Sequence, residues 1–208
     1  MRAPSPADEV LIRTADEVDA GDVAPELTEV LAWARTYLVS PSPDLGRRGP
    51  VCPYTQPSLQ RGLFFLASPT SPDVPGAVAG LRRWYEAVAA TMPAPDRELL
   101  TVLLVLPHVD PVDPTPLDEL QRAAKDDFVA NGLMIGQFHP ACEAPGLWNP
   151  DYRPLRSPVP LLAIRELVVF DLPFLVEERK HLDSYLSRFA PTIPTRVRRQ
   201  LTARLAPR

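Results

Sequence analysis

The segment that most constrains the fold is Leu99–Leu106, which is apolar at every position except Thr101. A strand covered by helices on both faces has such a continuous apolar run, whereas a half-exposed strand alternates apolar and polar residues. Pro107 and His108 follow directly and mark its end. We therefore predict that Leu99–Leu106 is the central strand of a sheet and its most buried element.

The other apolar segments alternate between strand and helix patterns around this run. Strands are predicted at 62–67, 133–138 and 167–170, helices at 25–38, 74–92, 117–131, 175–189 and 194–205, and one or two helical turns at 160–166. The alternation indicates an α+β fold, a small mixed sheet with helices packed on it. A ferredoxin-like sandwich with elaborations is the first choice, and an open doubly wound α/β sheet is the alternative.

Length and proline distribution suggest one domain. The chain has 208 residues, 45% of them hydrophobic and 23% charged, which suffices for a core of ordinary size. Its 27 prolines cluster between the apolar segments and so mark loops. Residues 1–22 are acidic and contain prolines, so we expect a flexible N-terminal arm followed by a single α+β domain over 23–208.

Charge and missing motifs exclude several function classes. The net charge of −4 and the pI of about 5.4 argue against a nucleic-acid surface. No run reaches the roughly 18 apolar residues of a membrane span, and the N-terminus has no apolar signal core, so we expect a cytoplasmic protein. In a reducing cytosol Cys52 and Cys142 are expected to be free thiols. The P-loop, GxGxxG, GxSxG and HExxH motifs are absent from the sequence.

The stretch 133–166 contains the best candidates for a functional site. The apolar run 133–136 leads through Phe138 to His139, so a buried strand delivers a histidine to its end. The proline-rich loop that follows carries Trp148. We predict that Phe138 and Trp148 line one cavity with His139, because an aromatic wall keeps water from a site.

His139 and Cys142 form an HxxC pair. A histidine nitrogen and a thiolate are ligands for zinc, iron or haem iron, so a haem or a transition metal is a candidate cofactor. A third ligand would have to come from Cys52, His108 or Asp151. In the alternative interpretation His139 is hydrogen-bonded at the end of a strand and Cys142 only fills space.

A second candidate, Cys52, lies in the long loop 41–61, followed by Pro53 and Tyr54. A nucleophilic cysteine needs an electropositive neighbourhood or a basic partner. Arg47, Arg48 and Arg61 are the candidates for such a field, with Tyr54 a candidate for substrate contact. In the alternative interpretation Cys52 is a small buried hydrophobic residue.

Three arginines follow His139 in the sequence. Arg153, Arg156 and Arg165 are predicted to bind a carboxylate or phosphate, because a guanidinium donates two parallel hydrogen bonds to such groups. The alternative is ion pairing with nearby carboxylates. Glu166, or Asp151, is a candidate catalytic base.

Three motifs together resemble known families. Cys52-Pro-Tyr54, Phe138-His139-Pro140 and the segment from Arg156-Ser-Pro-Val-Pro to Arg165-Glu166 are similar, in the same order, to an uncharacterised bacterial family of domains of unknown function, numbered 6875. A family numbered 1415 is more distantly similar. The resemblance covers residues 30–175, and it implies small stand-alone domains, some encoded in natural-product gene clusters. It also implies that the loops of Cys52, His139 and Arg156 form one site.

Together these observations predict an enzyme of specialised metabolism that acts on a small anionic metabolite at a Cys/His/Arg site. Its catalytic residues would be His139, Cys52 and Glu166, with a haem or metal on His139. The alternatives are metal-free catalysis with Cys52 as nucleophile and His139 as base, and a binding module without enzymatic activity. A homodimer is also among the expectations. We further predict that the Cys52 loop packs against the loop holding His139 and Arg156.

Overall fold

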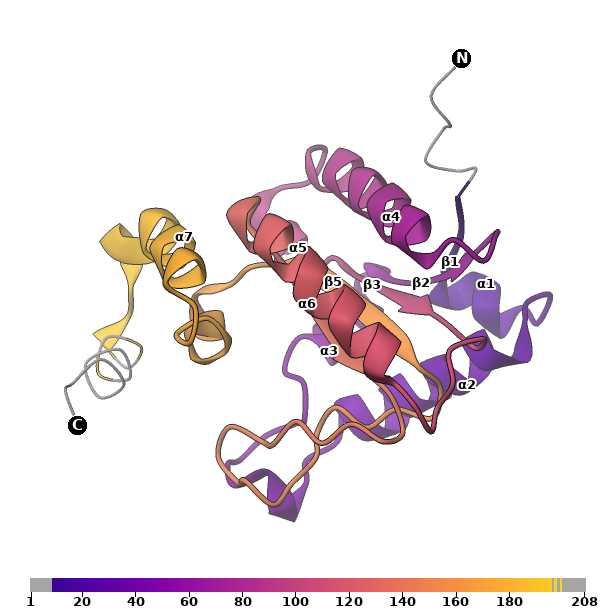
Figure 1. The fold of residues 1–208 in the computed structure, drawn as a ribbon, viewed down its shortest axis with the longest axis horizontal. Coiled ribbons are helices and arrows are strands. Elements are labelled where there is room, and N and C mark those ends of the chain that lie inside the picture. Colours follow the sequence, from indigo (N-terminus) through magenta and orange to yellow (C-terminus); the bar gives the residue numbers. More distant parts are fainter. Residues whose placement is uncertain (1–8, 196, 198, 200–208) are drawn as a thin grey trace.

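A computed structural model of the chain, which describes residues 9–195, 197 and 199, contains a five-stranded mixed sheet with the strand order β1-β2-β3-β5-β4 (Figure 1). The strands are β1 (Val10–Thr14), β2 (Phe64–Pro69), β3 (Thr101–Val105), β4 (Leu133–Phe138) and β5 (Leu161–Glu166). β2 and β3 are parallel, and the other neighbouring pairs are antiparallel. β4 reaches the sheet only through β5.

β3 is the middle strand, as its composition predicts. It pairs with β2 on one side and with β5 on the other, and Val102 to Val105 are all at most 3% exposed. Both of its faces are covered. Val102 and Leu104 belong to one core cluster, and Leu103 and Val105 belong to another.

Helices lie on both faces of the sheet. The longer elements are α2 (Pro25–Trp33), α4 (Val74–Ala89), α6 (Thr115–Ala130) and α7 (Arg179–Phe189), and the short ones are α1 (Ala15–Asp19), η2 (Ala34–Leu38), η3 (Pro43–Leu45), α3 (Thr55–Gln60), α5 (Ala94–Arg97), η4 (Val169–Phe174) and η5 (Ala190–Thr192). α4 and α6 cover the front of the sheet in Figure 1, and α1, α2 and α3 lie behind it. Each face therefore has its own apolar core.

The α+β class is confirmed: a small mixed sheet has helices packed against it. Within that class the arrangement differs from a ferredoxin-like sandwich, because helices cover both faces of the sheet. The covering of both faces is shared with the doubly wound alternative. Both faces are covered because successive apolar residues of β3 point into the two cores in turn, so neither face of β3 can be exposed to water.

A third cluster attaches the C-terminal part of the chain. Leu172, Leu182 and Tyr185 pack with Val129 of α6. Figure 1 shows α7 and η4 beside the sheet at the end of α6, away from the other helices. The basic helix predicted over 194–205 lies largely outside the described residues.

Two predictions about strands are corrected. Residues 160–166, predicted as helical turns, form β5, and residues 167–170, predicted as a strand, lead into η4. The flexible arm predicted over 1–22 is wrong for 10–19, which form the edge strand β1 and the capped helix α1. The loop predicted over 41–61 also contains α3. None of the helices in the described residues is both long enough and apolar enough to cross a lipid bilayer.

Candidate functional site

The edge of the sheet where β3 and β4 end and β5 begins holds His139. Phe138 pairs with Leu161, the first residue of β5, and its side chain packs against Trp33 behind the sheet. Successive side chains of a strand point to opposite faces, so His139 turns toward α6. The prediction that a strand delivers His139 to its end is confirmed.

The side chain of His139 is 2% exposed and lies beside Asp118 in the first turn of α6. Its Nε2 atom is 3.3 Å from Oδ1 of Asp118, but the two atoms are not aligned as a hydrogen bond. Neither ring nitrogen of His139 has a hydrogen-bond partner among the described residues. Buried polar groups are nearly always paired, so an unpaired imidazole next to a carboxylate needs an explanation.

Cys142 closes the turn after His139. Its backbone N–H donates a 3.1 Å hydrogen bond to the carbonyl of His139, and its side chain is buried. Burial raises the pKa of the Cys142 thiol, and the nearby carboxylate of Asp118 acts in the same direction. The raised pKa favours the neutral thiol, which is the less nucleophilic form.

Arg153 and Arg156 converge on one carboxylate, Glu143. Nε of Arg153 donates a 3.1 Å hydrogen bond to Oε2 of Glu143, and Nη2 of Arg156 donates a 2.5 Å hydrogen bond to Oε1. Nε of Arg156 also donates to the carbonyl of Cys142 at 3.2 Å, which ties this cluster to the turn after His139. Two of the predicted anion-binding arginines thus lie together, in the same loop as His139.

Cys52, Tyr54, Arg165 and Asp171 form a second cluster elsewhere. The guanidinium of Arg165 binds both carboxylate oxygens of Asp171, at 2.7 and 2.5 Å, and lies 5.4 Å from the ring centroid of Tyr54. Burial opposes the charge of Arg165, but Asp171 outweighs it, and Cys52 and Tyr54 act in the same direction, so the pKa of Arg165 is raised. Burial also raises the pKa of Tyr54. Arg165 is therefore engaged within the protein and is not placed as a substrate ligand.

The two clusters lie on opposite faces of the sheet. Cys52 packs with the core behind the sheet, and its backbone N–H donates to the carbonyl of Leu38 at 2.8 Å. His139 faces α6 in front. In addition, Arg165 pairs with Thr101 at the start of β3, at the end of the sheet remote from His139. The prediction of one site shared by Cys52 and His139 is wrong.

Two further site predictions are corrected by the contacts. Glu166, a predicted base, accepts a hydrogen bond from Arg188 and lies 3.7 Å from Nε of Arg97, so its charge is already compensated. Phe138 faces away from His139 and does not share a cavity with it. Trp148 is 47% exposed, so no closed aromatic wall covers His139.

The loops that carry the two clusters do pack together, as predicted. The side-chain amide of Asn149 donates a 2.7 Å hydrogen bond to the carbonyl of Asp44. The hydroxyl oxygens of Tyr37 and Tyr152 are 2.8 Å apart. The two loops therefore contact each other, but Cys52 and His139 lie on opposite faces of the sheet.

Metal ligands do not gather around His139. Within residues 9–195, 197 and 199, no group of three or more His, Cys, Asp or Glu side chains is placed to hold a metal ion. Cys52 lies on the other face, and His108 is exposed. Both cysteines are free thiols.

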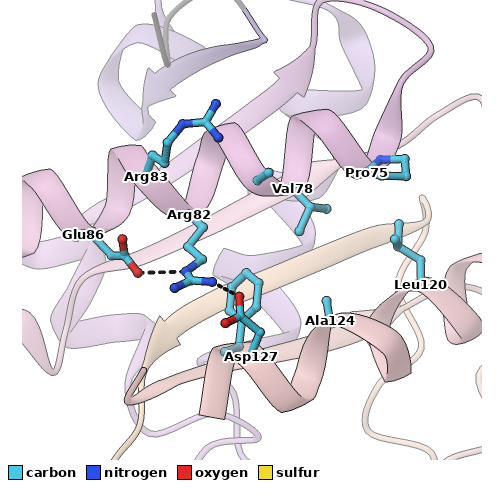
Figure 2. A pocket seen from close by; sticks show the side chains of 10 residues that line it. Pro75, Val78, Arg82, Arg83, Glu86, Leu120, Ala124 and Asp127 are labelled. Atoms are coloured by element: carbon cyan, nitrogen blue, oxygen red, sulfur yellow. Dashed lines mark hydrogen bonds and ion pairs between the residues drawn. The ribbon is translucent and has the colours of Figure 1, made fainter. Parts of the chain in front are cut away.

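A hollow of about 390 Å³ lies between α4 and α6 (Figure 2). Arg82 reaches across it, donating a 2.8 Å hydrogen bond to Glu86 and forming an ion pair with Asp127. Val78 and Leu120 contribute apolar surface. None of the predicted site residues lines this hollow, and its arginines are paired with carboxylates.

The chain matches a known protein family. The model of a family described as "Domain of unknown function (DUF6875)" matches residues 27–200. The chain belongs to this family. No curated protein and no solved structure matches it. The matched region contains β2 to β5 and both clusters, so the family covers the sheet without its edge strand β1.

Two residues of the His139 cluster in this DUF6875 chain were not predicted from the sequence. They are Asp118, in the first turn of α6, and Glu143, in the loop after His139. A topological signal existed for Asp118: a helix that returns between two parallel strands begins at the edge where the following strand ends. Residue 118, near the start of the predicted helix, and residue 139, at the end of the predicted strand, are therefore expected at the same edge of the sheet.

Proposed function

We propose that this protein is an enzyme that transfers a proton to or from a small anionic metabolite, with His139 as the acid–base group. The observation that supports this proposal is the buried imidazole of His139, which has no hydrogen-bond partner in the described part of the chain and lies 3.3 Å from Asp118. Leaving a buried polar group unpaired costs about 1–3 kcal/mol. A chain that only needed to fill this space would do so more stably with an apolar side chain.

Asp118 has the part of an orienting partner. A carboxylate beside one ring nitrogen orients the imidazole and leaves the other nitrogen for the substrate. Nδ1, the nitrogen remote from Asp118, is then the atom that exchanges a proton with the substrate. Because Nδ1 is buried, the loop over 139–160 has to move when substrate enters.

Arg153 and Arg156 supply the affinity for an anion. Both are partly exposed, and both donate to a carboxylate already, that of Glu143. Arg165, Cys52 and Tyr54 are left out of the proposed site because they lie in the other cluster. Catalysis with Cys52 as nucleophile and His139 as base is not proposed, because the two side chains lie in different clusters. The proposed site consists of protein side chains alone.

The family resemblance and the composition bear on the setting of this activity. The family resemblance suggests specialised metabolism, and the acidic charge suggests a small-molecule substrate rather than nucleic acid. A cytoplasmic location and a homodimer stay predictions.

The test is substrate consumption. Purified protein is incubated with a mixture of small carboxylates and phosphate esters in deuterated water, and mass spectrometry follows deuterium incorporation or loss of each compound. We expect wild-type protein to alter at least one compound. The variants His139→Asn and Asp118→Asn should lose the activity, since removing an acid–base group costs about 10²–10⁴-fold.

The matched control is His108→Asn, which removes an exposed histidine. Circular dichroism and thermal unfolding establish that each variant is folded. Activity that survives in a folded His139→Asn variant would refute the proposal. Anion binding without turnover of any compound would favour the binding module.

A further inference from the structure

The carboxylate of Glu143 lies between the guanidinium groups of Arg153 and Arg156, where an anionic ligand could bind. Its carboxylate accepts hydrogen bonds from two arginines of the same loop, yet its side chain is 71% exposed. The hydrogen bonds from Arg153 and Arg156 lower the pKa of Glu143, so it is ionised at neutral pH. An exposed ion pair contributes little to stability, so this contact can be exchanged at low cost.

The two arginines do not depend on Glu143 for their placement. Nη1 of Arg153 donates to the carbonyls of Pro150, at 2.5 Å, and Tyr152, at 3.3 Å. Nε of Arg156 donates to the carbonyl of Cys142 at 3.2 Å. Each side chain is therefore held by the backbone of the loop, and both would stay in place if Glu143 swung away.

The charges also leave room for an anion. Two guanidinium groups face one carboxylate, which leaves a net charge of +1 in this cluster. A guanidinium pair matches the planar geometry of a carboxylate and binds it with parallel hydrogen bonds. Glu143 shows which chemical group fits between them.

We propose that Glu143 is an internal competitor that occupies the substrate's carboxylate site, and that a small carboxylic acid displaces it to bind Arg153 and Arg156. This inference rests on the proposed function and names its substrate class. Glu143 directly follows Cys142, whose backbone N–H donates to the carbonyl of His139, so the proposed carboxylate site adjoins the proposed acid–base group.

The experiment measures binding of succinate by nuclear magnetic resonance, using the side-chain Nε–Hε signals of the arginines. We expect succinate to shift the signals of Arg153 and Arg156 in wild-type protein. Glu143→Ala should bind succinate about fivefold more tightly, because one exposed ion-pair contact no longer competes. Glu29→Ala, which removes an exposed glutamate on α2, should bind like the wild type.

Two further variants complete the design. Adding Arg156→Gln to Glu143→Ala should abolish the shift at Arg153, and inorganic phosphate in place of succinate should bind more weakly. Equal succinate affinity in Glu143→Ala and wild type, or no binding by either, would overturn the inference, as would tighter binding of phosphate. Turnover that survives in a folded His139→Asn variant would count against the proposed function alone, whereas unchanged succinate affinity in Glu143→Ala would count against this inference alone.

Discussion

The surroundings of the two cysteines differ. Cys52 is half-buried beside Arg165, whereas Cys142 is 2% exposed and burial raises the pKa of its thiol. A thiolate is the reactive form, and it must be reached by the reagent. We predict that iodoacetamide at pH 7.5 modifies Cys52 at least about tenfold faster than Cys142. Peptide mapping by mass spectrometry measures both rates, and faster labelling of Cys142 would contradict the prediction.

Arg165 and Asp171 form a largely buried ion pair, with side chains 20% and 3% exposed. Replacing Arg165 with Met leaves the carboxylate of Asp171 buried without its cation. We predict that Arg165→Met lowers the free energy of unfolding by about 3 kcal/mol, as for other buried pairs deprived of one partner. Urea unfolding at pH 7 measures it.

The control for that experiment is Arg179→Met. Arg179 pairs with Asp183 on the surface of α7, with side chains 86% and 53% exposed. Exposed pairs of this kind contribute about 0.3–0.5 kcal/mol. A loss at Arg165 no larger than the loss at Arg179 would show that the pair has no stabilising role.

At the residue scale the sequence predicted that His139 and Arg156 lie in one loop system, but it did not predict the groups that they contact. His139 and Arg156 do lie in one loop system, since a strand end and a proline-rich loop are local features. Cys52 was assigned to the same site because its motif looked functional. Cys52 lies behind the sheet in the cluster of Arg165, whereas His139 faces α6 in front. That separation depends on sheet pairing, which a single sequence does not reveal.

At the element scale, α7 is attached to α6 through Asp126. Its carboxylate accepts hydrogen bonds from Lys180, at 2.6 Å, and lies 2.8 Å from Nε2 of the buried His181. The hydrogen bond from Lys180 is the main cause that lowers the pKa of Asp126, with His181 adding to it. A carboxylate with a lowered pKa stabilises the folded state above its unfolded pKa, and this contribution is lost as the pH falls through its folded pKa.

We therefore predict that α7 loosens below a pH of about 4, where unperturbed aspartates take up protons. Amide hydrogen exchange between pH 3 and 6 should show exchange in α7 rising relative to β3 as the pH falls. Asp126→Asn should remove this pH dependence. Asp183→Asn, which alters a pair internal to α7, should keep it.

Prediction of the elements succeeded where a segment was long or strongly apolar. β3, β4, α4 and α6 lie within a few residues of their predicted bounds. β5 was predicted as helical because its six residues are too few to show a periodicity and because prolines precede it. Short apolar runs fit a buried strand or a helix equally well, and the partner strands decided the outcome here.

At the scale of the whole molecule, the two proline-rich loops are held together at Gly46. This glycine has φ +74°, and a Cβ atom there would lie 2.8 Å from the backbone oxygen of Trp148. We predict that Gly46→Ala separates the loops and makes residues 140–155 several times more sensitive to limited proteolysis. Gly21→Ala is the control: φ is +90°, and nothing lies within 4 Å. Equal cleavage of the two variants would mean that backbone strain, not the contact, matters.

The position of β5 between β3 and β4 has a consequence for biosynthesis. β4 leaves the ribosome before β5, yet it has no other strand to pair with. Until residue 166 has been made, the nascent chain exposes two unpaired strand edges, which are sites of aggregation and chaperone binding. The environment of His139 therefore forms only after most of the chain has been synthesised. A product truncated before Leu161 lacks β5, and β4 and His139 are then not joined to the sheet.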